Sequence, residues 1–85
     1  MSKIEKAKDR LRMKPKDYTY TEAKYILSQL GFEESQKGRT SGSRVAFYRK
    51  SDEKVIMLHK PHPGDVMKVG AVKQLLEFLM DLGEL

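Results

Sequence analysis

The sequence contains no cysteine and no tryptophan, and it has no long apolar run. Without cysteine the chain can form neither a disulfide framework nor a thiolate-bound zinc site. No stretch approaches the roughly 18 apolar residues that a membrane span requires. The first ten residues, MSKIEKAKDR, also lack the apolar core of a signal peptide. We therefore expect a cytoplasmic protein.

The chain is also short, with 85 residues. A chain of this length buries only about 60–65% of the surface that it would expose unfolded. Because the core is thin, it leaves no room for a deep cofactor cleft, and we expect no cofactor. With 39% hydrophobic and 34% charged residues, the composition is typical of a globular domain rather than a disordered chain.

Positive charge is unevenly distributed along the chain, whose net charge is +5. Residues 1–16 are rich in lysine and arginine, whereas the last stretch leans acidic. Between residues 36 and 50 there is no acidic residue, and the basic residues there are Lys37, Arg39, Arg44, Arg49 and Lys50. Such asymmetry indicates a surface that faces a polyanion, with nucleic acid as the first candidate. A merely solvated basic surface is the alternative.

Hydrophobic periodicity predicts three helices. Residues 3–13 carry an apolar stripe that stops before Pro15, which predicts a short accessory helix in a basic arm over residues 1–16. A second helix is predicted over residues 20–30, where Thr19 and Glu22 fit a capping box and apolar residues recur at i, i+3, i+4 and i+7. The helices predicted at 20–30 and 69–82 are followed by the capping glycines Gly31 and Gly83.

Between these helices the period changes to that of strands, predicted over residues 32–37, 43–50 and 54–59. Alternation places Val45, Phe47, Ile56 and Leu58 on the buried face. It leaves Arg44, Tyr48 and His59 on the open face, although a slip of one residue would reverse this assignment. The order of helix, three antiparallel strands and helix predicts an α+β two-layer domain over residues 17–85, with an extra N-terminal helix.

The two histidines, His59 and His62, flank a proline turn at the end of the last strand. They lack the three or four protein ligands of a typical zinc site, so we predict no metal. Histidine can take and give a proton near neutral pH, which makes acid–base catalysis the sharper hypothesis. The alternative is that one imidazole caps the turn and the other packs at the sheet edge.

The glycine- and serine-rich stretch over residues 38–43 offers backbone amides that suit a phosphate, but the pattern by itself favours an ordinary hairpin loop. It lacks the Lys-Ser/Thr ending of a nucleotide-binding loop. Tyr48 supplies a ring on which a base can stack, or one that can cover a partner's apolar surface. The residues that we predict to contact RNA are Lys37, Arg39, Ser43, Tyr48 and Lys60.

Two motifs occur in a fixed order over about residues 17–83: GSR-x-x-F at residues 42–47 and LHKPHPG at residues 58–64, followed by a helix rich in Val, Lys, Gln and Leu. In this order the sequence resembles the HicA toxins of bacterial HicA–HicB toxin–antitoxin pairs. The resemblance implies a small fold similar to a double-stranded RNA-binding domain and a metal-independent mRNA interferase. It also implies a HicB-type antitoxin that masks the active face.

In many HicA proteins a catalytic histidine follows Gly-Ser, whereas here Arg44 follows Ser43. Arginine remains protonated and cannot act as a general base, but it can grip a phosphate. The predicted catalytic residues are therefore His59, His62 and Arg44. Two alternatives remain: a non-catalytic RNA-binding module of the same fold, and a protein–protein adaptor that uses the basic face for an acidic partner.

Overall fold

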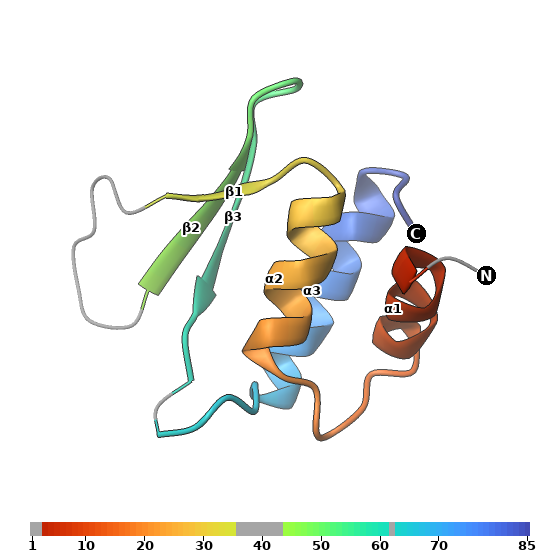
Figure 1. Cartoon of the computed structure of the whole chain (residues 1–85), viewed down its shortest axis with the longest axis vertical. Helices are drawn as coiled ribbons and strands as arrows, with labels where there is room; N and C mark the ends of the chain where they lie inside the picture. The colour runs from red at the N-terminus through yellow and green to blue at the C-terminus, as the bar shows by residue number, and fades with distance from the viewer. Residues whose placement is uncertain (1–2, 36–43, 62) are drawn as a thin grey trace.

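The computed structural model of the protein describes residues 3–35, 44–61 and 63–85. Its elements in chain order are α1 (Lys3–Arg12), α2 (Tyr20–Gln29), β1 (Glu33–Ser35), β2 (Arg44–Arg49), β3 (Lys54–His59) and α3 (Val69–Asp81). The strands form one antiparallel sheet in the order β1-β2-β3. Helices α2 and α3 lie on the same side of the sheet, and α1 packs against both of them on the side away from the sheet (Figure 1). This arrangement confirms the predicted α+β two-layer fold.

Helix α2 begins and ends where its sequence signals place it. The Thr19 hydroxyl accepts from the Glu22 backbone N–H at 3.1 Å, and the Glu22 carboxylate accepts from the Thr19 backbone N–H at 3.0 Å. These two bonds confirm the predicted capping box. At the other end Gly31 has φ +94°, and the Phe32 N–H donates to the Leu27 carbonyl at 2.9 Å. This Schellman motif requires the left-handed conformation that glycine adopts without a steric penalty.

The register of β2 and β3 confirms the predicted faces of the sheet. Val45 pairs with Leu58, and Phe47 pairs with Ile56. Phe47, Ile56 and Leu58 are buried, and Val45 packs against the core. Since alternate residues of a strand point to opposite faces, Arg44, Tyr48 and His59 share the face turned away from the helices.

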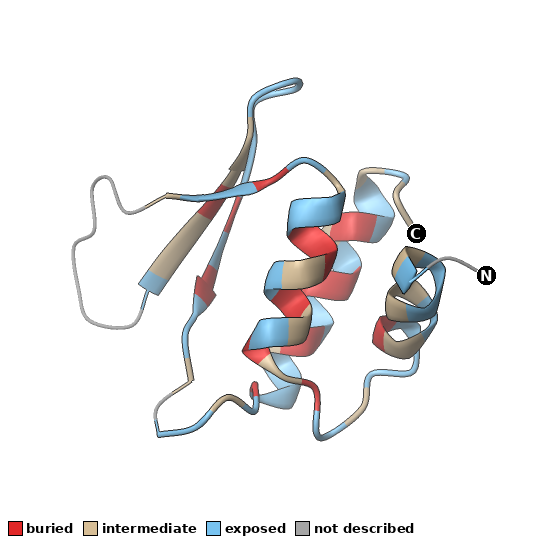
Figure 2. Ribbon diagram, viewed as in Figure 1, coloured by how far each residue is buried: buried red, intermediate tan, exposed pale blue. Residues whose placement is uncertain are grey.

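The core lies between the sheet and the helices and continues beneath α1 (Figure 2). On α3 the side chains of Val72, Leu75 and Leu79 are fully buried and that of Leu76 is nearly so, which is the spacing of one helical face. Leu11 of α1 is also fully buried and belongs to the same hydrophobic cluster. Helix α1 therefore packs into the same hydrophobic core as the sheet and the other helices. The sequence pattern predicted only an accessory helix. The boundary between residues 16 and 17 remains a prediction.

The segment after the proline turn pairs with the segment before α2, a contact that the sequence pattern did not reveal. Thr19 and Val66 form an isolated antiparallel bridge. The Met67 N–H donates to the Tyr18 carbonyl at 2.8 Å, and the Tyr20 N–H donates to the Asp65 carbonyl at 2.7 Å. This pairing buries Tyr18 and Met67 and holds the polypeptide that leaves β3 against the start of α2.

Candidate functional site on the open sheet face

The open face of the sheet consists of three rows of side chains that cross the strands. The strand register places Arg44 opposite His59 in the first row. In the second row Ser35, Ala46 and Met57 are neighbours, and in the third row Glu33, Tyr48 and Val55 are neighbours. The first row lies at the end of the sheet where β1 and β3 finish and β2 begins. The third row lies toward the other end, which carries the β2–β3 turn (Figure 1).

Arg44 and His59, both predicted catalytic residues, are direct cross-strand partners. Residues paired in this way have Cβ atoms about 4.5–5.5 Å apart. Both side chains belong to exposed residues, so a ligand on this face can reach them together. A guanidinium group binds phosphate oxygens through charged hydrogen bonds, and an imidazole can transfer a proton. The pair therefore places a phosphate-binding group next to a group that can transfer a proton.

Lys60 and Tyr48, two of the predicted RNA contacts, lie at different distances from this pair. Lys60 is exposed and follows His59 directly along the chain. Tyr48 is half-buried and lies four residues from Arg44 along β2, which corresponds to roughly 13 Å. A ligand that contacts both Tyr48 and the Arg44–His59 pair must therefore extend along the strand. A single mononucleotide would not reach both positions.

Four predicted site residues lie outside the described residues: Lys37, Arg39, Ser43 and His62. Their predicted roles stay predictions. Ser35 precedes the gap at residues 36–43 and Arg44 follows it, while Pro61 precedes the gap at residue 62. Ser35 ends β1 and Arg44 begins β2. Both lie at the end of the sheet where β3 finishes at His59.

The open face carries two exposed apolar side chains, both on β3. Val55 is 49% exposed and Met57 is 45% exposed. Met57 lies in the middle row beside Ala46, and Val55 lies in the third row beside Tyr48. Exposed apolar side chains next to a basic pair suit contact with a protein partner as well as with RNA.

The side chain of Arg49 binds other residues of the protein, although the sequence placed Arg49 in the basic stretch over residues 36–50. Its Nη2 donates to Asp52 Oδ2 at 2.6 Å, and its Nη1 donates to Glu84 Oε2 at 2.9 Å and to the Leu30 carbonyl at 3.1 Å. The guanidinium also lies over the Phe32 ring, 4.8 Å from its centroid. The hydrogen bonds that Arg49 donates to Asp52 and Glu84 raise the pKa of Arg49, and those that it donates to Asp52 lower the pKa of that carboxyl group. Arg49 is therefore a structural residue.

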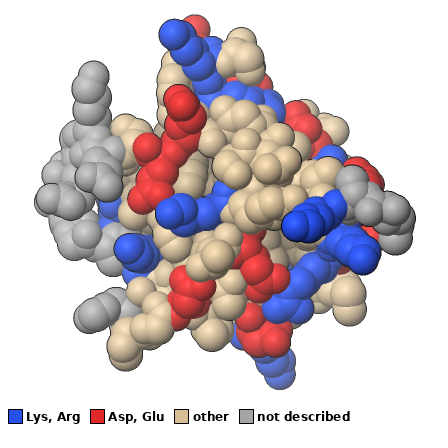
Figure 3. Space-filling model, viewed as in Figure 1, with Lys and Arg blue, Asp and Glu red and all other residues tan. Residues whose placement is uncertain are grey.

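Arginines of α1 are paired in a similar way. Arg10 forms ion pairs with Glu22 and Asp17, and Arg12 pairs with Asp9 at 2.6 Å. On the face that Figure 3 shows, Lys and Arg side chains lie next to Asp and Glu side chains. A count of the lysines and arginines in residues 1–16 thus overstates the number of unpaired cations that α1 presents to a polyanion. Such pairing is not visible in a count of residues along the sequence.

Within residues 3–35, 44–61 and 63–85, no three His, Cys, Asp or Glu side chains lie close enough to hold a metal ion. Asp65, the carboxylate nearest in sequence to the histidines, accepts from the Thr21 backbone N–H at 3.2 Å and so caps α2. Among the described helices, none is long and apolar enough to cross a membrane.

The fold and this face define a small α+β domain whose open sheet surface pairs Arg44 with His59 and exposes Val55 and Met57. A comparison with protein families agrees with the sequence resemblance: the family described as HicA toxin of bacterial toxin–antitoxin matches residues 20–80. The match includes α2, the sheet and nearly all of α3, and it leaves α1 outside. The chain belongs to the HicA toxin family. Neither curated proteins nor solved structures gave a match.

Proposed function

We propose that the chain is a metal-independent ribonuclease that cleaves mRNA in the cytoplasm and is inhibited by a HicB-type antitoxin. The observation that carries this proposal is the cross-strand pairing of Arg44 with His59 on the open face. Membership of a toxin family supports a toxic activity and an antitoxin partner. The pairing supports RNA as the substrate, because it presents a phosphate-binding group next to a proton acceptor.

The proposed reaction is attack of a ribose 2′-hydroxyl on the neighbouring phosphodiester. His59 accepts the proton of the 2′-hydroxyl while the oxygen forms a bond to phosphorus. Arg44 and Lys60 stabilise the negative charge that develops on the phosphorane. The bond from phosphorus to the 5′-oxygen then breaks, and that oxygen takes a proton from a general acid. His62, which lies outside the described residues, is the candidate for this acid.

The remaining predicted contacts extend the RNA track. Lys37, Arg39 and Ser43 would bind phosphates next to the reacting one, and Tyr48 would stack a base farther along β2. The exposed Met57 lies between these positions and Val55 lies beside Tyr48, and both offer apolar surface to the antitoxin. An antitoxin seated on them would cover the Arg44–His59 pair, because the side chains share one face of the sheet.

Single substitutions test the catalytic assignment. With purified protein, EDTA and a labelled RNA, His59→Ala should lower the cleavage rate by about 100- to 10,000-fold, the typical contribution of a general base. Arg44→Ala should lower the rate while the RNA also binds more weakly. Lys54→Ala, at the opposite end of β3, is the matched control. An unchanged rate in both His59→Ala and the double variant with His62→Ala would disprove histidine catalysis.

A second candidate function is RNA binding without cleavage. Arg44 stands where many HicA proteins carry the catalytic histidine, and this substitution favours the second candidate. The two functions predict different results when labelled RNA is incubated with the wild-type protein and its length and gel mobility are followed over time. Progressive shortening supports the ribonuclease, whereas a stable shift in mobility with intact RNA supports the binding module.

A further inference from the structure

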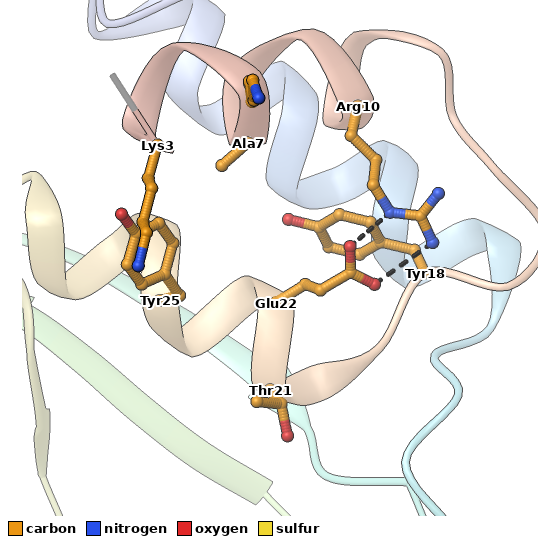
Figure 4. A pocket seen from close by; sticks show the side chains of 8 residues that line it. Lys3, Ala7, Arg10, Tyr18, Thr21, Glu22 and Tyr25 are labelled. Atoms are coloured by element: carbon orange, nitrogen blue, oxygen red, sulfur yellow. Dashed lines mark hydrogen bonds and ion pairs between the residues drawn. The ribbon is translucent and has the colours of Figure 1, made fainter. Parts of the chain in front are cut away.

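A cleft of about 420 Å³ lies between α1 and the first turns of α2. One face of α1 contributes Lys3, Lys6, Ala7 and Arg10, which follow the i, i+3, i+4, i+7 spacing of a single helical face. In Figure 4, Lys3 and Ala7 point from α1 toward Tyr25 of α2, and Arg10 closes one end by binding Glu22. This cleft lies on the side of the helices away from the sheet, so a ligand in it does not contact Arg44 or His59 (Figure 1).

Tyr18 lines the cleft with a hydroxyl that has no partner. Only 1% of this residue is exposed, and its hydroxyl oxygen is buried without a hydrogen bond among the described residues. The hydroxyl points toward the space between α1 and Tyr25 (Figure 4). Burial raises the pKa of Tyr18, so the group is a neutral hydrogen-bond donor. Buried polar groups without a partner are rare, and this one suits an acceptor oxygen supplied by a ligand.

The charges at the cleft favour an anionic ligand. The carboxylate of Glu22 is neutralised by Arg10, which also pairs with Asp17. Lys3 and Lys6 make no ion pair within the described part of the chain. Two lysine ammonium groups therefore remain available at the rim of a cleft whose interior is formed by Ala7 and two tyrosine rings.

A peptide fits these features better than RNA does. Bases bind to single-stranded RNA sites by stacking on exposed aromatic faces. The Tyr18 ring is buried beneath α1, and Arg10 lies 5.9 Å from its centroid, so a base cannot stack on it. An apolar side chain fits between Ala7 and Tyr25, and flanking carboxylates can reach Lys3 and Lys6. The cleft depends on α1, which lies outside the family match.

We propose that the α1–α2 cleft binds an acidic peptide segment of the antitoxin, with an apolar side chain inside and carboxylates on Lys3 and Lys6. A carbonyl or carboxylate oxygen of this segment accepts from the Tyr18 hydroxyl. The inference rests on the antitoxin partnership proposed above. The cleft would be a second contact, distant from the sheet, so the antitoxin would bind the toxin on two sides.

The test measures, by calorimetry, the binding of a HicB-type antitoxin to the full chain and to its variants. Lys3→Glu combined with Lys6→Glu should weaken binding by about tenfold and flatten its salt dependence. Lys14→Glu combined with Lys16→Glu has the same charge change outside the cleft lining, and it should weaken binding much less. RNA cleavage by each variant alone should equal that of the wild type.

Tyr18→Phe separates binding from folding. Removing an unpartnered buried hydroxyl should leave the free protein as stable as the wild type or more stable, whereas antitoxin binding should weaken by about fivefold. Unchanged antitoxin binding in Tyr18→Phe and in the Lys3/Lys6 variant would overturn the cleft proposal alone. Loss of RNA binding instead of antitoxin binding would also overturn it. A wild-type chain that binds no such protein would contradict the partnership itself.

Discussion

At the scale of single residues, Arg49 shows how one side chain can connect three parts of the fold. Its guanidinium joins the end of α2 through Leu30, the β2–β3 turn through Asp52 and the C-terminal segment through Glu84. The side chain is only 12% exposed. Gly31 lies beside it, and a Cβ atom there would meet Arg49 Cδ at 3.4 Å. The sequence shows Arg49 as one more basic residue, because Leu30 and Glu84 are distant from it along the chain.

We predict that Arg49→Ala lowers the free energy of unfolding by about 1.5–3 kcal/mol, since hydrogen bonds to charged groups are lost and the Leu30 carbonyl loses its donor. Arg49→Lys should recover only part of this loss, because lysine cannot form the same forked set of bonds. Urea denaturation of both variants, with Lys50→Ala as the exposed control, measures the effect. Equal stability of Arg49→Ala and the control would contradict a structural role.

Glu22 provides a second prediction at this scale, on the pH dependence of stability. Burial acts to raise its pKa, but hydrogen bonds from Arg10 and Thr19 outweigh burial and hold the pKa below its ordinary value. A carboxyl group with a lowered pKa in the folded state contributes stability above its unfolded pKa, about 4.3. That stability is lost as the pH falls through the folded pKa.

Glu22→Gln should therefore flatten the decrease in stability between about pH 6 and about pH 3, because glutamine does not titrate. The measurement is chemical denaturation across this range for the wild type and the variant. Glu77→Gln, on the exposed face of α3, is the control. Parallel curves for the wild type and Glu22→Gln would show that the Arg10–Glu22 pair contributes no pH-dependent stability.

At the scale of elements, local sequence signals predicted the helices and the strand faces well. The capping box, the terminal glycines and the alternation in β2 and β3 act over a few residues, and the structure confirms each of them. The contacts between Tyr18 and Met67 and between Thr19 and Val66 join segments far apart in sequence. Periodicity carries no information on such pairing, so this part of the core could not be predicted.

Helix α1 is the element whose importance the sequence understated. Its charged residues suggested an accessory arm, but fully buried Leu11 packs in the main core. We predict that Leu11→Ala destabilises the protein by about 2–5 kcal/mol, as expected for a large-to-small change in a packed core. Met13→Ala, at a position 78% exposed, should have little effect. Thermal unfolding of the two variants gives the comparison, and similar melting temperatures would contradict the assignment.

At the scale of the whole molecule, the fold separates two surfaces. The open sheet face carries Arg44, His59 and Tyr48, and the α1–α2 cleft lies beyond the helices on the other side (Figure 1). The sequence predicted the first surface because strand alternation and the motifs around Arg44 and His59 are local. It could not predict the cleft, because the cleft requires the packing of α1 on α2.

The ribonuclease proposal is best tested by incubating RNA with the protein in the presence of EDTA and identifying the new ends. We predict fragments with 2′,3′-cyclic phosphate and 5′-hydroxyl ends, because the 2′-hydroxyl is the nucleophile. His59→Ala should abolish most of this product while the protein stays folded. Intact RNA after prolonged incubation, or fragments with 5′-phosphate ends, would contradict the proposed reaction.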